Sequence, residues 1–289
     1  MNFLIVLLAI ILLEAYSELG FVQRDNWLRK WHSALHKLGL SSQPSALGLI
    51  VFLAVPLLLL YLLLSTLAQQ GLGLFVFLLE LVVLLYALGR GNLDTQIALL
   101  TSDLQRDDLQ AAFHDAAVFN TAYREGSAES AEDLKEEVFA ALPYRIFERS
   151  FVVVFWFFLL GAPAALAYRL LALYGDLRLD SQDSRAAKWL WLMEWLPVRL
   201  LGITLGLVGN FSHAAGSTRQ LVFSRSIGSG EFLRSAIKGA LQSKEAAPTF
   251  QSKEAAPTLD AQTINDVVSL LGRAMTAWLV VIAILVILS

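Results

Sequence analysis

Four charged side chains lie inside long apolar stretches of the sequence, where an unpaired charge is costly. They are Glu80, Arg169, Glu194 and Arg199. An ionisable group at membrane depth costs roughly 3 kcal/mol or more unless it is paired or hydrated. Pairing of Glu80 with Arg169 or Arg199 would offset that cost, and such a pair suits a binding site and a purely structural contact equally well. Arg169 lies near the end of its stretch, so it can also reach the membrane surface.

A second group of charges flanks the apolar stretches. Arg145 and Arg149 are one helical turn apart with Glu148 between them, and Arg90 and Asp94 follow the run that ends at residue 88. Two arginines on one helix face can hold a carboxylate or phosphate bidentately, although the same residues also serve as anchors at a membrane surface. The predicted ligand-binding residues are therefore Arg90, Asp94, Arg145, Glu148, Arg149, Arg169 and Arg199, with Glu80 and Glu194 as buried charge partners.

The composition excludes several classes of function. Of 289 residues, 56% are hydrophobic and 16% charged, which is typical of a membrane protein rather than a soluble domain. A net charge of −3 gives no excess of positive charge for nucleic acid, and the absence of cysteine excludes thiolate chemistry. His32 and His36 have no evident third ligand, and no phosphate-binding or metalloprotease motif occurs. We therefore expect no metal and no cofactor.

The elements that must position these charges are membrane helices. A helix needs roughly 20 apolar residues to cross the hydrocarbon core. Five runs approach that length, at 47–67, 72–88, 151–173, 189–208 and 267–288, and a sixth at 3–13 either crosses or re-enters. The sequence thus predicts an all-α, polytopic integral membrane bundle of about five to six transmembrane helices with a helical cytoplasmic lobe.

Charge distribution predicts the orientation of this bundle. The four-residue link 68–71 forces its flanking runs into an antiparallel hairpin, which places 14–46 and 89–150 on one side. With six crossings, that side also includes 209–273 and carries 17 Lys and Arg residues, and the segment 174–188 on the other side carries three. Since cytoplasmic loops carry the excess of basic residues, the main loops are predicted to be cytoplasmic.

Five regions follow from these runs. They are 1–88 with N-terminal membrane helices, 89–150 as the cytoplasmic lobe, 151–208 as a transmembrane hairpin, 209–266 as a cytoplasmic segment and 267–289 as the last membrane helix. The sequence Gln-Ser-Lys-Glu-Ala-Ala-Pro-Thr occurs twice in tandem between residues 242 and 259. Such a duplication is tolerated only where little packs on the backbone, so 242–259 is interpreted as a tether.

Local patterns add detail to the cytoplasmic segments. Apolar residues recur at helical spacing in 24–38, which predicts an amphipathic helix that lies either on the membrane surface or in the core of a small lobe. An αα-hairpin is predicted over 93–119, with Asp107 and Asp108 at the start of its second helix. A further helix is predicted to begin near Ser130 and to run toward the stretch that starts at 151.

Two segments resemble the AmpE/CobD superfamily of bacterial inner-membrane proteins. They are residues 155–169, which end in Tyr168-Arg169, and residues 194–200, Glu-Trp-Leu-Pro-Val-Arg-Leu. Residues 13–14, 25–28 and 88–93, with the overall length and the order of the spans, extend the likeness over most of the chain. The resemblance is closest to the AmpE branch.

The resemblance implies alternative functions. The AmpE branch is described as a membrane regulator of β-lactamase induction linked to cell-wall signalling, which implies a modulator with an anionic ligand or a membrane protein partner, located in the inner membrane. The CobD branch is an amide-forming synthase of cobalamin assembly. Here only Tyr168-Arg169 and Pro197-x-Arg199-Leu200 match the polar pattern of that branch, so a role without catalysis is favoured. Transport is a third interpretation, which the absence of an internal repeat of spans disfavours.

Overall fold

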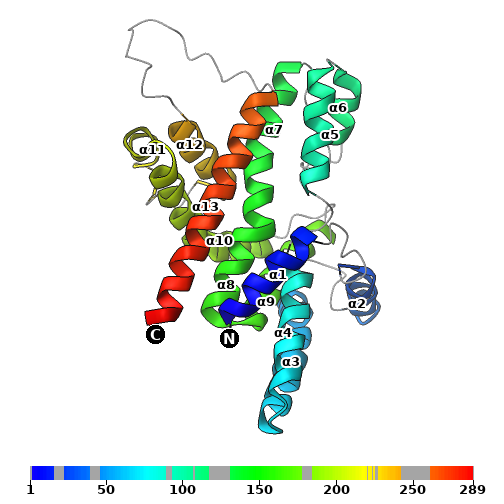
Figure 1. The fold of residues 1–289 in the computed structure, drawn as a ribbon. Helices are drawn as coiled ribbons and strands as arrows, with labels where there is room; N and C mark the ends of the chain where they lie inside the picture. The colour runs from blue at the N-terminus through cyan, green and yellow to red at the C-terminus, as the bar shows by residue number, and fades with distance from the viewer. Residues whose placement is uncertain are drawn as a thin grey trace, which may run out of the picture. The chain divides into compact units, whose positions relative to one another are not determined.

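The structure is a computed structural model that describes residues 2–15, 23–39, 46–88, 93–106, 108–116, 131–177, 184–219, 221–222, 224, 227–241 and 261–288. Within those residues every regular element is a helix, which confirms the all-α class (Figure 1). The chain divides into two compact units. Unit 1 comprises 1–92 and 149–194, and unit 2 comprises 93–148 and 195–289. The lobe predicted over 89–150 therefore does not stand alone, because its residues 93–148 pack with 195–289.

Three helices in the described residues are long and apolar enough to cross a membrane. They lie at Ala46–Gln69, Arg185–Val208 and Thr263–Leu288 and correspond to three of the predicted runs. The predicted run 72–88 forms α4 (Gly73–Ala87), and the run 3–13 falls in α1 (Asn2–Ala15). At about 1.5 Å per residue these two helices are roughly 20 Å long, shorter than the ~30 Å hydrocarbon core.

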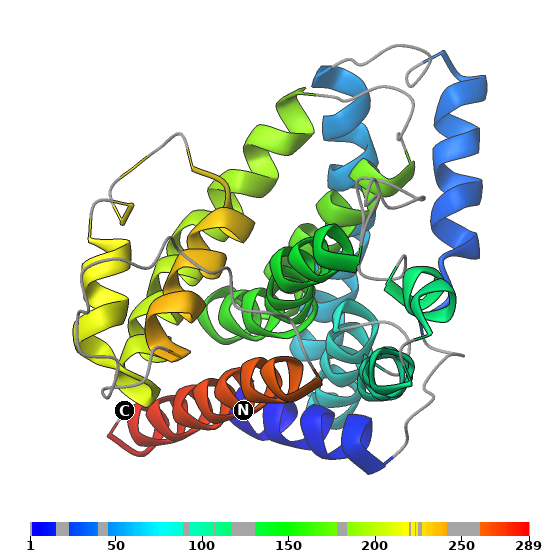
Figure 2. The same cartoon turned by 90° about the horizontal axis from the view of Figure 1, so that it is seen from above.

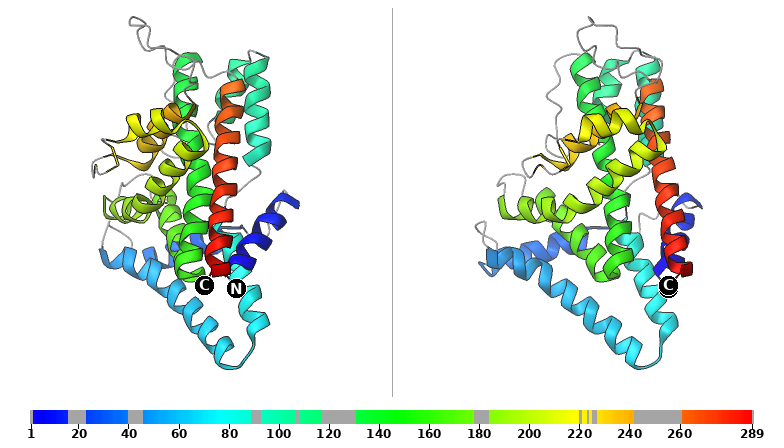
Figure 3. Two further views of the ribbon diagram at one scale, coloured as in Figure 1. Left: turned by 60° about the vertical axis from the view of Figure 1, so that its left-hand side comes forward. Right: turned by 90° about the vertical axis from the view of Figure 1, so that its left-hand side faces the viewer.

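In unit 1, α3 (Ala46–Gln69) and α4 are joined by a tight turn at Gly71, whose φ is +72°. Figure 3 shows this hairpin in light blue and cyan. Helix α2 (Asn26–Lys37) packs against α3, and α1 packs against α4. The amphipathic prediction for 24–38 is confirmed in its helical part. Leu28 and Leu35 are each 1% exposed, so the apolar face of α2 lies against the protein.

The predicted span 151–173 is not one helix. It is split into α8 (Val152–Leu160) and α9 (Ala162–Leu177) by Gly161, which has a φ of +79°. A left-handed residue ends an α-helix, and glycine adopts that conformation without steric cost. Pro163 then fits the first turn of α9, where its missing N–H has no helical acceptor to lose. Helices α8 and α9 pack against each other, and neither is long enough to cross a membrane alone.

Two prolines inside helices each leave a main-chain carbonyl without its usual N–H donor, and a tryptophan side chain bonds to that carbonyl instead. Pro56 in α3 has no N–H for the carbonyl of Phe52, and Pro197 in α10 (Ser184–Val208) has none for the carbonyl of Met193. The indole Nε1 of Trp31 donates to the Phe52 oxygen at 3.3 Å, and that of Trp156 donates to the Met193 oxygen at 3.0 Å. Each freed carbonyl is therefore satisfied by a side chain from another helix.

Unit 2 contains the predicted αα-hairpin, formed by α5 (Leu93–Gln105) and α6 (Leu109–Ala116). The Asp108 carboxylate accepts a hydrogen bond from the Ala111 backbone N–H at 3.1 Å, which confirms Asp108 at the N-terminus of α6; Asp107 lies outside the described residues. Helix α7 (Ala131–Ile146) continues through a π-helical turn, η1 (Phe147–Phe151), into α8. The predicted helix toward residue 151 is thus confirmed, while Ser130 and the tether 242–259 lie outside the described residues.

The remaining helices of unit 2 pack through small residues. Helix α11 (Phe211–Thr218) lies against α12 (Ser229–Leu241), as Figure 2 shows in yellow and orange, and α13 (Ala261–Leu288) contacts α5, α7 and α12. A Cβ added to Gly202 would lie 2.6 Å from Phe232 of α12, and one added to Gly206 would lie 3.3 Å from Ala214 of α11. Gly202 and Gly206 therefore let α11 and α12 approach α10 closely.

Candidate functional site

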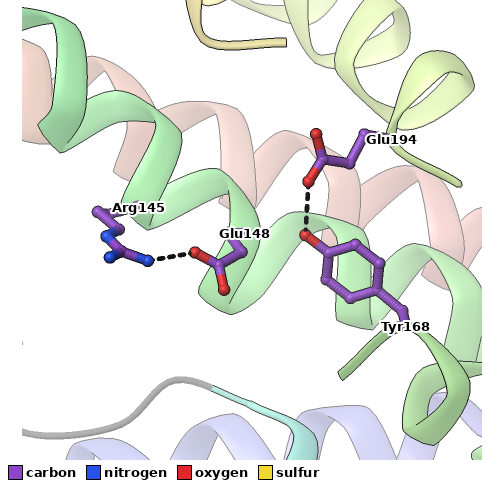
Figure 4. Close-up of polar contacts among 4 residues, drawn as sticks. All are labelled: Arg145, Glu148, Tyr168 and Glu194. Carbon is purple, nitrogen blue, oxygen red and sulfur yellow. Dashed lines mark hydrogen bonds and ion pairs between the residues drawn. The ribbon is translucent and has the colours of Figure 1, made fainter. Parts of the chain in front are cut away.

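Glu194 and Tyr168 form a buried polar contact in unit 1. The Tyr168 hydroxyl donates to a Glu194 carboxylate oxygen at 3.0 Å, and the two residues are 0% and 3% exposed (Figure 4). Tyr168 lies on α9 and Glu194 on the first half of α10. A phenol can hold a carboxylate in an apolar environment, because a hydrogen bond to the charged oxygen offsets part of its lost hydration. The structure thus gives Glu194 a partner that sequence reasoning did not assign.

Arg169 follows Tyr168 on α9 and is 4% exposed. It is therefore buried in unit 1 and does not extend to the surface. Helix α9 also packs against α4. The hydroxyl of Tyr86 on α4 donates to Asp25 Oδ1 at 3.0 Å just before α2. Adjacent residues of a helix point about 100° apart, so Arg169 faces a different direction from Tyr168, whose hydroxyl meets α10.

The end of α9 reaches the region where α2 meets α3. The ring of Tyr174 lies 4.9 Å from that of Phe52 on α3 and 6.2 Å from that of His32 on α2. His32 is also 6.2 Å from Phe52, so it packs edge-on among aromatic rings. His36 is exposed. No group of three or more metal-ligating side chains occurs in the described part of the chain.

Arg145 and Glu148 form a buried ion pair in unit 2. The distance from Arg145 Nη1 to Glu148 Oε2 is 2.7 Å, and the residues are 8% and 6% exposed (Figure 4). The pair straddles the junction of α7 with the π-helical turn, and such turns recur at functional sites. The predicted clamp of Arg145 and Arg149 includes this turn and stays a prediction, because the two residues belong to different units. Arg145 holds a carboxylate of its own chain, and Arg149, half-buried, belongs to unit 1.

Arg199 is held by main-chain oxygens of unit 2. Its guanidinium donates to the carbonyls of Trp195, Val222 and Ser224 at 3.1, 2.8 and 2.9 Å. Its Cζ lies 4.5 Å from the ring centroid of Trp195 and 5.3 Å from that of Phe232, within cation–π range. These contacts tie α10 to the segment around 222–224 and to α12. They describe a structural arginine, so we remove Arg199 from the candidate site.

The remaining predicted residues are placed as follows. Glu80 is half-buried in α4, and its predicted ion pair with Arg169 is not formed between these two described residues of unit 1. The alternative pair with Arg199 would join the two units and stays a prediction. Asp94 lies in α5, but its side chain is outside the described set, as is Arg90 entirely.

The candidate site is therefore the set of polar residues on α9 and on the elements of unit 1 around it. We call this set the α9 cluster and define it as Tyr168, Arg169, Glu194, Tyr86 and Asp25. Sequence reasoning identified Arg169 and Glu194 because charge inside an apolar run is conspicuous. It missed Tyr86 and the role of Tyr168, since a tyrosine in such a run gives no signal of its own. The chain matches no protein-family model, no curated protein and no solved structure.

Proposed function

We propose that this chain is a multi-pass protein of the bacterial inner membrane that modulates β-lactamase induction in response to a cell-wall signal, as its resemblance to the AmpE branch implies. The supporting observation is the α9 cluster, which combines a buried arginine with a buried, hydrogen-bonded carboxylate beside the break at Gly161. Ionisable residues that are buried inside membrane proteins are typical of binding or relay sites. The signal is an anionic small molecule or a membrane protein partner that contacts Arg169.

The helix break suggests how this site is arranged in the membrane. We propose that α8 and α9 enter and leave the bilayer on the same side. The predicted run 151–173 then does not cross the membrane. In support, α9 begins at the Gly161 turn and its Tyr174 lies against His32 and Phe52, close to α2 and the start of α3. Non-helical backbone is tolerated at membrane depth where protein covers it, as a buried hairpin requires.

Labelling of single cysteines tests this arrangement, and the cysteine-free chain needs no background mutations. Gln70, Lys188 and Arg29 are exposed positions of unit 1, at the turn of the α3–α4 hairpin, on α10 and on α2. An impermeant maleimide should label Lys188→Cys from the same side as Arg29→Cys and from the opposite side to Gln70→Cys. Labelling of Lys188→Cys from the Gln70 side would show that residues 151–173 cross.

Conservative variants of the α9 cluster test the function. Glu194→Gln keeps an acceptor for Tyr168 but removes the charge, and Tyr168→Phe removes only the hydroxyl. We expect each to impair β-lactamase induction by a β-lactam at unchanged protein levels, with Lys188→Gln as an exposed control on the same helix. Normal induction in both variants would remove the site. Complementation of a cobalamin-synthase deletion by the unmodified gene would favour the amide-forming alternative instead.

A further inference from the structure

Helix α2 carries a basic face with no acidic residue on the helix. Its sequence, Asn26–Lys37, contains Arg29, Lys30 and Lys37 and neither aspartate nor glutamate. All three basic side chains are exposed, as is Ser33. Residues three and four apart are neighbours on a helix surface, so Arg29, Lys30 and Lys37 surround Ser33. The exposed face of α2 is thus a continuous positive patch, which we call the α2 patch and define by these four residues.

The opposite face of α2 is already occupied by the protein. Leu28 and Leu35 are buried, Trp31 donates its indole hydrogen bond to the Phe52 carbonyl, and the His32 ring packs on Phe52. An amphipathic helix that binds lipid by insertion needs its apolar face free. Here Leu28, Trp31 and Leu35 hold α2 onto α3, so these residues are not free to insert, and the basic residues lie on the side that remains exposed.

The position of α2 fixes what the patch can meet. It is held beside the first third of α3, a helix long and apolar enough to cross a membrane. None of Arg29, Lys30 and Lys37 forms an ion pair with another described residue of the chain. Basic clusters next to the end of a membrane helix are attracted to anionic lipid headgroups, at about fivefold in affinity per Lys or Arg.

From this charge complementarity we propose that the α2 patch docks on the anionic phospholipid headgroups of the leaflet that α3 enters. The attraction is electrostatic and reversible, and it does not involve insertion of an apolar face. Docking would fix α2 at the headgroup layer, and with it the start of α3, on which Trp31 and His32 pack. The inference concerns unit 1 alone and does not depend on the proposed role in β-lactamase induction.

A label at the centre of the patch tests the proposal on the full chain. Ser33→Cys introduces one cysteine into the cysteine-free sequence, and it carries a fluorophore whose quenching by a water-soluble quencher reports exposure. The labelled protein is reconstituted in vesicles of phosphatidylcholine alone or mixed with phosphatidylglycerol. We expect several-fold less quenching in the mixed vesicles, with the difference lost at about 1 M salt, where the screening length is about 3 Å.

Charge-neutral variants supply the matched comparison. In R29Q/K30Q/K37Q the docking equilibrium should fall about a hundredfold, because three charges are removed. The control R106Q/K188Q/R219Q removes three exposed basic residues from other helices and their ends, and it should behave like the parent. The tryptophan fluorescence spectrum of each protein confirms that the fold is kept, since Trp31 is half-buried against α3.

Three results would overturn the proposal. One is equal quenching of the label in both lipid mixtures, and another is an equal loss of protection in the control triple variant. The third is protection of the label in phosphatidylcholine vesicles by inorganic phosphate alone, which would make the patch a site for a free anion. If the label is protected only when an acidic protein is added, quenching is again equal in the two lipid mixtures. That outcome would also exclude the lipid surface as the partner of the patch.

Discussion

The two halves of α10 satisfy their buried charges in different ways. Before Pro197, Glu194 receives a hydrogen bond from the Tyr168 side chain of α9. After Pro197, Arg199 donates to three main-chain carbonyls and packs on two aromatic rings. Main-chain acceptors are fixed by the fold and cannot be exchanged for a ligand at low cost, whereas a side-chain contact can open. Charge inside an apolar run therefore identifies two kinds of residue, one structural and one available for function.

The largest expected effect is on the free energy of unfolding, and it comes from Arg199, the structural residue of the two. Arg199→Ala leaves the carbonyls of Val222 and Ser224 without the charged donor that now holds them. We expect the free energy of unfolding to fall by about 3 kcal/mol, because hydrogen bonds to charged groups are strong and buried acceptors without partners are costly. Denaturant titration in detergent measures this. Lys188→Ala, an exposed change on the same helix, should stay within about 0.5 kcal/mol of the parent.

A second change sharpens the comparison by disturbing the packing around Arg199. Gly202→Ala would place its Cβ 2.6 Å from the buried Phe232 ring, which also stacks near the Arg199 guanidinium. Overpacking of this kind costs about 2 kcal/mol. Gly216→Ala in α11 meets nothing within 4 Å and should be neutral or stabilising by up to about 1 kcal/mol. Equal unfolding midpoints for the two variants would contradict the packing described for α10 and α12.

A third prediction concerns Pro197, which separates the two halves. Trp156→Phe leaves the Met193 carbonyl without the indole donor and should cost about 1.5 kcal/mol. In a Pro197→Ala background the restored N–H can bond that carbonyl, so the same change should cost about 1 kcal/mol less. A double-mutant cycle measures the coupling. Additive effects would mean that the tryptophan does not serve the proline-freed carbonyl.

The smallest effect lies away from α10, in the α5–α6 hairpin. Burial first, and then the charge of Asp115, raises the pKa of the Asp103 carboxyl above its ordinary value. The folded state holds this proton more tightly, so protonation of Asp103 contributes to the stability of the hairpin. The contribution is complete below the ordinary Asp pKa of about 4 and is lost as the pH rises through the raised pKa. Asp115→Asn should flatten this dependence in pH-resolved thermal unfolding. An unchanged profile would exclude the coupling of the two carboxyls.

Much of the fold follows from sequence patterns, and the exceptions have physical causes. The length of the apolar runs predicts α3, α10 and α13, because a run of roughly 20 apolar residues is typical of a helix that crosses a membrane. An acidic residue before a helical pattern predicts the start of α6. Gly161 and Pro163 indicate a kink in the run 151–173, but the complete break depends on the left-handed conformation of Gly161, which hydropathy does not register. The tryptophan bonds to the proline-freed carbonyls were not predicted because they join segments far apart in the chain.

The candidate site was predicted only in part, for a related reason. The cost of a buried charge can be read from its neighbours in sequence, so Arg169, Glu194 and Arg199 were found. Their partners depend on tertiary structure. The pairing of Glu80 with Arg169 was predicted from opposite charge alone, while the fold gives Arg199 main-chain carbonyls and gives Glu194 a tyrosine.

The division between a structural Arg199 and a functional Glu194 is tested most directly by measuring induction per molecule of folded protein. Cells that carry Arg199→Ala or Glu194→Gln are challenged with a β-lactam, and β-lactamase activity is divided by the amount of folded membrane protein in the same cells. The expected result is a normal ratio for Arg199→Ala with less protein, and a ratio reduced several-fold for Glu194→Gln with normal protein. The reverse pattern, or a normal ratio in both, would contradict this assignment.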